Sequence, residues 1–151
     1  ISENTDGNLV KTNDALKTNL KTWVNQYKMV NDTLDILDAK IVNLGINFIA
    51  IGMPGTNKFD VLDSCTTTLK SVFAKTFYIG EPLVITDIYQ ALKSVNDLLD
   101  VVKVELTGTN YSDPSISIEE AKSLDGRYLI APTDTVFEIK FPNQDIKGTI
   151  Q

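Results

Sequence analysis

Three aspartates spaced three residues apart are the first side chains whose type and spacing could support chemistry. Asp32, Asp35 and Asp38 lie in the stretch VNDTLDILDAK, just ahead of a long apolar run. On a helix, this spacing would place the carboxylates on neighbouring turns, where they could hold a metal ion. However, Asp38 alternates with Leu37 and Ala39 in a predicted strand, and the glycine and closing glutamate of a calcium-binding loop are absent. We therefore predict capping and solubilising roles for these carboxylates, and no metal site.

Cys65 is the only cysteine and the only other obvious nucleophile. A reactive thiol needs a neighbouring base or another group that lowers its pKa, and the chain contains no histidine. Because Cys65 falls on the apolar stripe of a predicted helix, we predict that it is a small core residue. A single cysteine also excludes an internal disulfide and fits a reducing compartment.

The remaining motifs do not complete an active site. The stretches GMPG and TGTN match neither a phosphate-binding loop nor a dinucleotide fingerprint. Glu119 and Glu120 are adjacent and would diverge on a helix, whereas a glycosidase needs two carboxylates that converge on a cleft. The absence of histidine removes the usual general base, metal ligand and pH switch. We predict no catalytic residue, no cofactor and no metal, and expect that the chain is not an enzyme.

The composition restricts the partners. The chain has 151 residues, of which 42% are apolar and 23% charged, as expected for one globular domain. The net charge is −6 and Arg127 is the only arginine, which argues against nucleic acid. The longest apolar run, Ile41 to Met53, is too short for a bilayer, so we predict no membrane contact. The first residue is Ile1 and no signal peptide is recognisable, so we expect a fragment of a longer chain.

The first predicted helix begins at Thr12 or Asn13, either of which can cap it. Its apolar positions recur at helical spacing: Leu16, Leu20, Trp23, Val24 and Tyr27. Trp23 and Tyr27 lie four apart on one face. A stripe facing the core is the favoured interpretation, and contact with another chain is the alternative.

A long strand is predicted over 36–51. Its apolar positions change from odd to even numbers near Ile41 and Val42, which predicts a bulge or bend there. Turn residues follow at 52–57, and Asn57, with Asp60 three residues later, begins a second helix. The apolar face of this helix is Leu62, Cys65, Leu69, Val72 and Phe73.

The second half of the chain contains a third helix and two more strands. Thr86 is the predicted cap of a helix that carries Ile88, Leu92 and Val95 on one face. The strand over 100–107 places Val102, Val104 and Leu106 on one buried face. Another strand lies between Pro132 and Pro142. This order predicts an α+β fold with a small, largely antiparallel sheet, helices packed on one face, and an extended C-terminal strand or arm.

Four segments follow from these elements: a polar extension or remnant of an upstream domain (1–11), an α+β domain (12–107), a linker (108–131), and a C-terminal strand and arm (132–151). Beyond Pro142 the only large apolar side chains are Ile146 and Ile150. Two isoleucines bury too little surface to fold alone. The tail is therefore either disordered or docked elsewhere, an added strand on an adjacent subunit being one possibility.

Two stretches carry a resemblance to a known family: LKTNLKTWVNQYKMVNDTLDILDAKIVNLGINF (16–48) and VFEIKFPNQDIKGTI (136–150). The first is similar to the start of the C-terminal region of the large baseplate wedge subunit of contractile-tailed bacteriophages, a baseplate J-like family, and the second resembles its closing segment. Between them, KFDVLDSCTTTLKSVFAKTFYIGEPLVITDIYQAL (58–92) resembles the broader baseplate J-like pattern.

The resemblance implies a structural role in the virion. Wedge subunits of this kind self-associate and join neighbouring wedges into a ring around the tail hub, after assembly in the host cytoplasm. The implied partners are other copies of the chain and other baseplate wedge proteins, and no catalytic residue is implied. We expect a homo-oligomer, a dimer for the fragment, because two-fold contacts are the commonest. The candidate contacts are Trp23, Tyr27, Phe141, Ile146 and Ile150.

Two other functions remain open from the sequence. An α+β scaffold could belong to a ligand- or metal-binding domain of an enzyme, because a fold does not fix a function. A regulatory adaptor module, which would bind an unrelated partner instead of its own copies, is the other possibility.

Overall fold

The computed structural model describes residues 1–29, 31–74, 77–109 and 116–151. It is an α+β fold with one mixed four-stranded sheet and two small two-stranded sheets, and helices pack against the main sheet. The predicted fold class is confirmed. In chain order the elements are β1 (Ser2–Glu3), β2 (Leu9–Val10), α1 (Asp14–Val24), β3 (Lys40–Gly52), α2 (Lys58–Phe73), β4 (Leu83–Val84), α3 (Ile85–Lys93), β5 (Leu98–Gly108), α4 (Ile118–Ala121), β6 (Tyr128–Leu129), β7 (Thr135–Glu138), α5 (Pro142–Asp145) and β8 (Ile146–Ile150).

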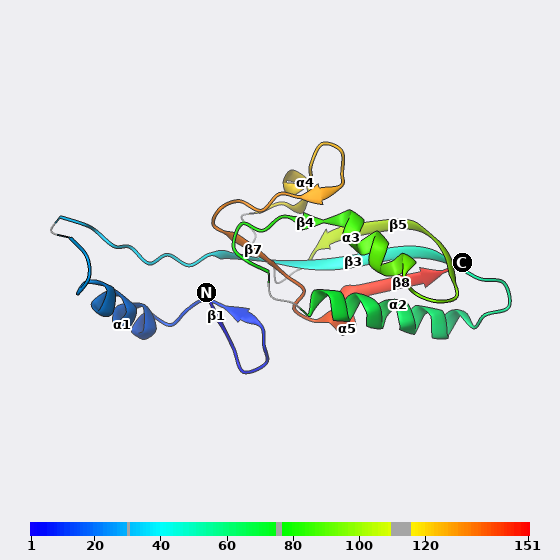
Figure 1. Cartoon of the computed structure of the whole chain (residues 1–151), viewed down its shortest axis with the longest axis horizontal. Helices are drawn as coiled ribbons and strands as arrows, with labels where there is room; N and C mark the ends of the chain where they lie inside the picture. The colour runs from blue at the N-terminus through cyan, green and yellow to red at the C-terminus, as the bar shows by residue number, and fades with distance from the viewer. Residues whose placement is uncertain (30, 75–76, 110–115) are drawn as a thin grey trace.

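Strand β3 is the centre of the main sheet. On one side it pairs antiparallel with β5. Its other side is shared by two short strands that lie end to end: β7 runs parallel to residues 40–43, and β8 runs parallel to residues 46–50. Figure 1 shows β3 running through the length of the sheet, with β5 and β8 beside it. The sheet is therefore mixed, with two parallel pairings formed by the end of the chain, and not largely antiparallel as predicted.

One face of β3 forms the core. Its even-numbered side chains are buried against α2, α3 and the neighbouring strands: Val42, Leu44, Ile46, Phe48 and Ala50. The predicted bend near Ile41 and Val42 is wrong, because β3 pairs with β7 there without a register shift. Leu37 and Ala39, which suggested the change of phase, precede the strand, and Leu37 is exposed.

The irregularities lie in the pairing of β3 with β5 instead. Lys103 pairs with Ile49 and Val101 pairs with Ala50, so Val102 has no opposite residue. A second register shift between Ile51 and Gly52 leaves Leu99 without one. Val102 and Leu99 are the two large apolar side chains of β5 that are exposed. The predicted strand is confirmed, but Val102 does not share the buried face of Val104 because of this bulge.

Helices α2 and α3 cover the buried face of the sheet and contact each other. Asn57 caps α2, as predicted, and its side chain accepts a hydrogen bond from the Phe59 amide at 3.1 Å. The predicted cap Thr86 is wrong, because α3 already begins at Ile85 and has no side-chain cap. Ile85 is buried, so packing against the core sets the start of this helix.

The predicted linker and tail contain ordered elements. Within residues 116–131, α4 packs beside β5, and β6 pairs with β4 in a small antiparallel sheet. The remainder of the predicted linker, at 110–115, lies outside the described residues. The tail is an added strand, β8, but it joins β3 of its own chain, and Ile146 is 5% exposed. The C-terminal segment is therefore part of the same sheet as residues 40–52.

Residues 11–39 form a projecting arm, of which the structure describes 11–29 and 31–39. Figure 1 shows α1 away from the sheet, at the end of the molecule opposite the C-terminus, with the following segment returning to β3. Beside the start of the arm, β1 and β2 form a small antiparallel hairpin. The arm and this hairpin carry side chains of the two candidate sites.

Candidate functional site

The projecting arm carries a stripe of exposed apolar side chains. Asn13, one of the two predicted caps, begins α1, and its side chain accepts a hydrogen bond from the Ala15 amide at 2.9 Å. In α1, all of whose residues the structure describes, no side chain is buried. The exposed apolar residues of the arm are Leu16, Leu20, Trp23, Tyr27, Met29 and Leu37.

Trp23 and Tyr27 are the centre of this stripe. Their ring centroids are 5.1 Å apart at an interplanar angle of 54°, and the two residues are 57% and 70% exposed. The favoured interpretation of a core stripe is therefore wrong. Periodicity identified the apolar face correctly, but periodicity cannot tell whether the rest of the same chain covers that face.

Asp38 fixes the base of the arm. Its carboxylate accepts a hydrogen bond from Lys17 Nζ at 2.5 Å and from the Thr12 amide at 3.2 Å, and the N-terminal ammonium group of Ile1 lies 3.5 Å away. The hydrogen bond from Lys17 is the main cause that lowers the pKa of Asp38. The same hydrogen bond raises the pKa of Lys17. This cluster holds α1 against the segment that returns to β3.

The other two aspartates act separately. Asp35 lies 3.7 Å from Lys21 Nζ, and Asp32 accepts a hydrogen bond from the Met29 amide at 3.2 Å. In the part of the chain that the structure describes, no three His, Cys, Asp or Glu side chains come together as ligands for a metal ion. The aspartates thus make local ion pairs and backbone contacts along the arm.

The C-terminal candidate residues lie far from this stripe in the fold. Ile146 is buried in β8, and half-buried Ile150 packs against the same core. Phe141 precedes α5, is partly exposed, and has Lys140 Nζ 5.7 Å from its ring centroid. The structure therefore brings Trp23 and Tyr27 together, and it uses the two isoleucines inside the chain.

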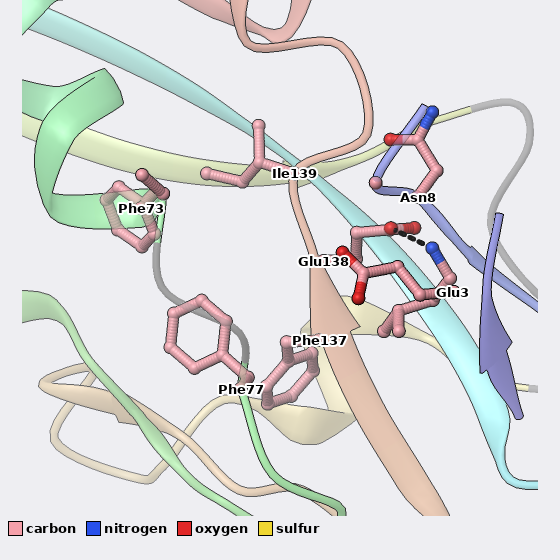
Figure 2. A pocket seen from close by; sticks show the side chains of 10 residues that line it. Glu3, Asn8, Phe73, Phe77, Phe137, Glu138 and Ile139 are labelled. Carbon is pink, nitrogen blue, oxygen red and sulfur yellow. Dashed lines mark hydrogen bonds between the residues drawn. The ribbon is translucent and has the colours of Figure 1, made fainter. Parts of the chain in front are cut away.

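A second feature is a pocket between the N-terminal hairpin and β7, here called the hairpin pocket. It has a volume of about 110 Å³. Carboxylates, an amide and phenylalanine rings line it, among them Glu3, Asn8, Phe73, Phe77, Phe137 and Glu138. Figure 2 shows the carboxyl group of Glu3 beside that of Glu138, with Phe73 and Phe77 on the opposite side.

Glu138 is the unusual member of this pocket. Its Oε1 accepts a hydrogen bond from the Leu9 amide at 2.6 Å, which connects β7 to the hairpin. Its Oε2 is buried and has no hydrogen-bond partner among the described residues. Burial raises the pKa of Glu138, and the Leu9 hydrogen bond and the charge of Lys140 act in the opposite direction. Sequence reasoning missed this residue, because a carboxylate between Phe137 and Ile139 is the ordinary alternation of a strand and gives no sign of burial.

Cys65 lies in the core, as predicted. It is fully buried on α2, and burial raises the pKa of its thiol. A buried thiol with a raised pKa is a poor nucleophile at neutral pH.

No protein-family model and no curated protein sequence matches this chain. Among the helices of the described residues, none combines the length and apolar character needed to cross a bilayer.

Proposed function

We propose that this chain is a structural component of a phage contractile-tail baseplate wedge, and that its projecting arm joins it to a second copy. The observation that carries the proposal is the exposed apolar stripe centred on Trp23 and Tyr27. The resemblance of residues 16–48 and 136–150 to the large baseplate wedge subunit supports the same role. Proteins of this class work by presenting surfaces to each other.

The arm has the properties of an uncovered interaction surface. Contiguous exposed apolar patches on a folded chain mark interaction sites. An isolated helix shorter than about 12 residues is marginal in water, and tertiary packing normally stabilises it. α1 has 11 residues and none is buried. Covering its stripe would stabilise the helix and remove aromatic surface from water.

The apolar stripe itself favours a second copy as the partner. Two α1 helices can cover each other through the same apolar residues, and contact through identical patches is what defines a two-fold interface. Asp14 and Lys21, in the first and last turns of the helix, lie on the face away from the stripe, so their charges do not oppose this pairing.

Sedimentation velocity over a wide concentration range tests the self-association. We expect the wild-type chain to form dimers as concentration rises. Trp23→Ser should weaken the association by about tenfold or more, since buried aromatic residues dominate interface energies. Phe59→Ser is the matched control, because Phe59 is 80% exposed but lies outside the arm. A monomer at every concentration, or an equal effect of the two substitutions, would overturn the arm interface.

The place of the chain in a particle needs a separate measurement. An antibody against the purified chain should decorate the baseplate end of contractile tails produced by the phage that encodes this sequence. Labelling of heads or sheaths only, or no labelling of disrupted particles, would contradict the baseplate role. A monomer that binds an unrelated protein through the arm would favour the adaptor module instead.

A further inference from the structure

The hairpin pocket combines negative charge with aromatic walls. Glu3 reaches it from β1, and Glu138 reaches it from β7. On the opposite side, the rings of Phe73 and Phe77 lie 5.9 Å apart between centroids. Figure 2 shows these groups around one space. Carboxylates beside the faces of aromatic rings are the two kinds of group that attract an organic cation.

One carboxylate oxygen in this pocket lacks a donor. Glu138 Oε1 receives the Leu9 amide, whereas the buried Oε2 receives no hydrogen bond from the described residues. A buried acceptor without a partner is costly, and it costs more when it carries charge. Lys140, the cation whose charge acts on Glu138, is not among the residues that line the pocket. Since no described residue supplies this donor, a bound ligand can supply it.

The chemistry of the walls selects the class of ligand. Calcium takes six to eight oxygen ligands and magnesium a nearly octahedral set, whereas much of this lining consists of phenylalanine and aliphatic carbon. An anion would face two carboxylates. A guanidinium or ammonium group can donate to Oε2 and at the same time rest its weakly hydrated face on a ring.

We propose that the hairpin pocket is a binding site for an organic cation of the alkylguanidinium or alkylammonium class, held by Glu138 and Glu3 and covered by Phe73 and Phe77. The site is independent of the projecting arm. Its loss would therefore leave the self-association of the chain unchanged, and a monomeric chain would still bind the cation.

Titration of the full chain with methylguanidinium chloride, followed by amide NMR, tests the site. We expect saturable shifts that centre on the amides of Gly7, Asn8 and Leu9. Methylurea, which has nearly the same shape and no charge, should cause no comparable shift, and potassium chloride controls for ionic strength. Without saturable shifts from methylguanidinium, or with equal shifts from methylurea, the cavity is a water site and the proposal fails.

Substitution of one carboxylate separates charge from structure. Glu138→Gln keeps an oxygen that can accept from the Leu9 amide and removes the charge, so binding should weaken by about tenfold or more. Glu105→Gln is the control, because Glu105 is an exposed carboxylate on β5 and does not line this pocket. Unchanged affinity in Glu138→Gln overturns the proposal.

A second substitution tests the site independently if Glu138→Gln disturbs the hairpin. Phe77→Leu retains both carboxylates and removes one ring, so methylguanidinium should bind several-fold more weakly while the hairpin amides keep their positions. Wild-type affinity in this variant would contradict the aromatic wall. A capped arginine peptide that binds at least as well as methylguanidinium identifies a protein side chain as the ligand, and binding of the small cation alone identifies a free metabolite; both results support the site.

Discussion

At the scale of single residues, a close approach between β8 and β3 depends on a glycine. Gly148 pairs with Phe48, and a Cβ atom placed on Gly148 would lie 2.2 Å from the Phe48 ring. Phe48 is 2% exposed and belongs to the hydrophobic core, so its ring is held by neighbouring core side chains. Because Gly148 has no side chain, β8 can pack directly against the Phe48 ring.

Gly148→Ala is therefore expected to destabilise the fold by about 1–3 kcal/mol, the usual cost of inserting atoms into a packed core. Urea denaturation of the variant and the wild type measures this difference. Gly108→Ala is the matched control, because a Cβ atom there would meet its nearest neighbour at 3.4 Å, an ordinary contact.

The mechanism also predicts a rescue. Phe48→Leu replaces the ring by a smaller side chain and should cost less in the Gly148→Ala background than alone, which a double-mutant cycle would measure. Additive effects of the two substitutions would mean that the ring and the glycine do not interact in this way.

At the scale of elements, two helices with the same capping chemistry have different surroundings. Asn13 caps α1 and Asn57 caps α2, each by accepting a hydrogen bond from the second amide after it. α2 buries Val61, Cys65 and Leu69, whereas α1 buries no residue. The Asn57 cap therefore stabilises a helix of the core, whereas the Asn13 cap stabilises only the helix of the arm.

Substituting each cap by alanine should separate these roles. Asn57→Ala is expected to lower the free energy of unfolding of the whole domain by about 0.5–2 kcal/mol. Asn13→Ala should instead fray α1, with faster amide exchange along the arm and weaker dimerisation, while the midpoint of global unfolding stays close to that of the wild type. An equal loss of global stability in both variants would show that the arm packs on the core.

The same pair of helices shows what the sequence can predict. Capping is a local interaction, so the sequence identified Asn57 as the cap of α2 and narrowed the cap of α1 to Thr12 or Asn13, of which Asn13 is the one used. The position of the stripe on each helix was also predictable. Whether a stripe is covered depends on segments distant in the sequence. For that reason a core stripe was the favoured interpretation of Trp23 and contact with another chain only the alternative, although Trp23 is exposed.

For the C-terminal tail, the sequence allowed an added strand but did not identify its partner, which is β3 of the same chain. Ile146 and Ile150 are four apart, which resembles a helical spacing, but with Gly148 between them they form the inward side of a strand. The partner of that strand, β3, lies about a hundred residues earlier in the sequence. Glu138 was missed because its partner, Leu9, is 129 residues away.

At the scale of the whole molecule, one strand connects every part of the main sheet. β3 pairs with β5, β7 and β8, and its first residues follow directly from the projecting arm. The two parallel pairings come from the end of the chain. The fold is therefore complete only after residues 135–150 have been added to β3.

Removal of residues 146–151 should consequently destabilise the whole domain. Loss of the Ile146 side chain alone is expected to cost about 2–5 kcal/mol, and an unpaired β3 edge promotes aggregation. Denaturant unfolding and light scattering of the truncated chain measure the two effects. Thr149→Ala, a change on the exposed side of β8, is the control and should behave as the wild type. A truncated chain with unchanged stability would contradict the role given to β8.

The direct passage from the arm into β3 has a mechanical consequence. No turn element separates the segment ending at Ala39 from the strand beginning at Lys40. A neighbour that pulls on the arm would load β3 along its own axis. The hydrogen bonds between β3 and the strands on both its sides would then bear that force together, in shear, instead of breaking one after another. An arm attached in this way would transmit force to its neighbour before β3 separates from the sheet.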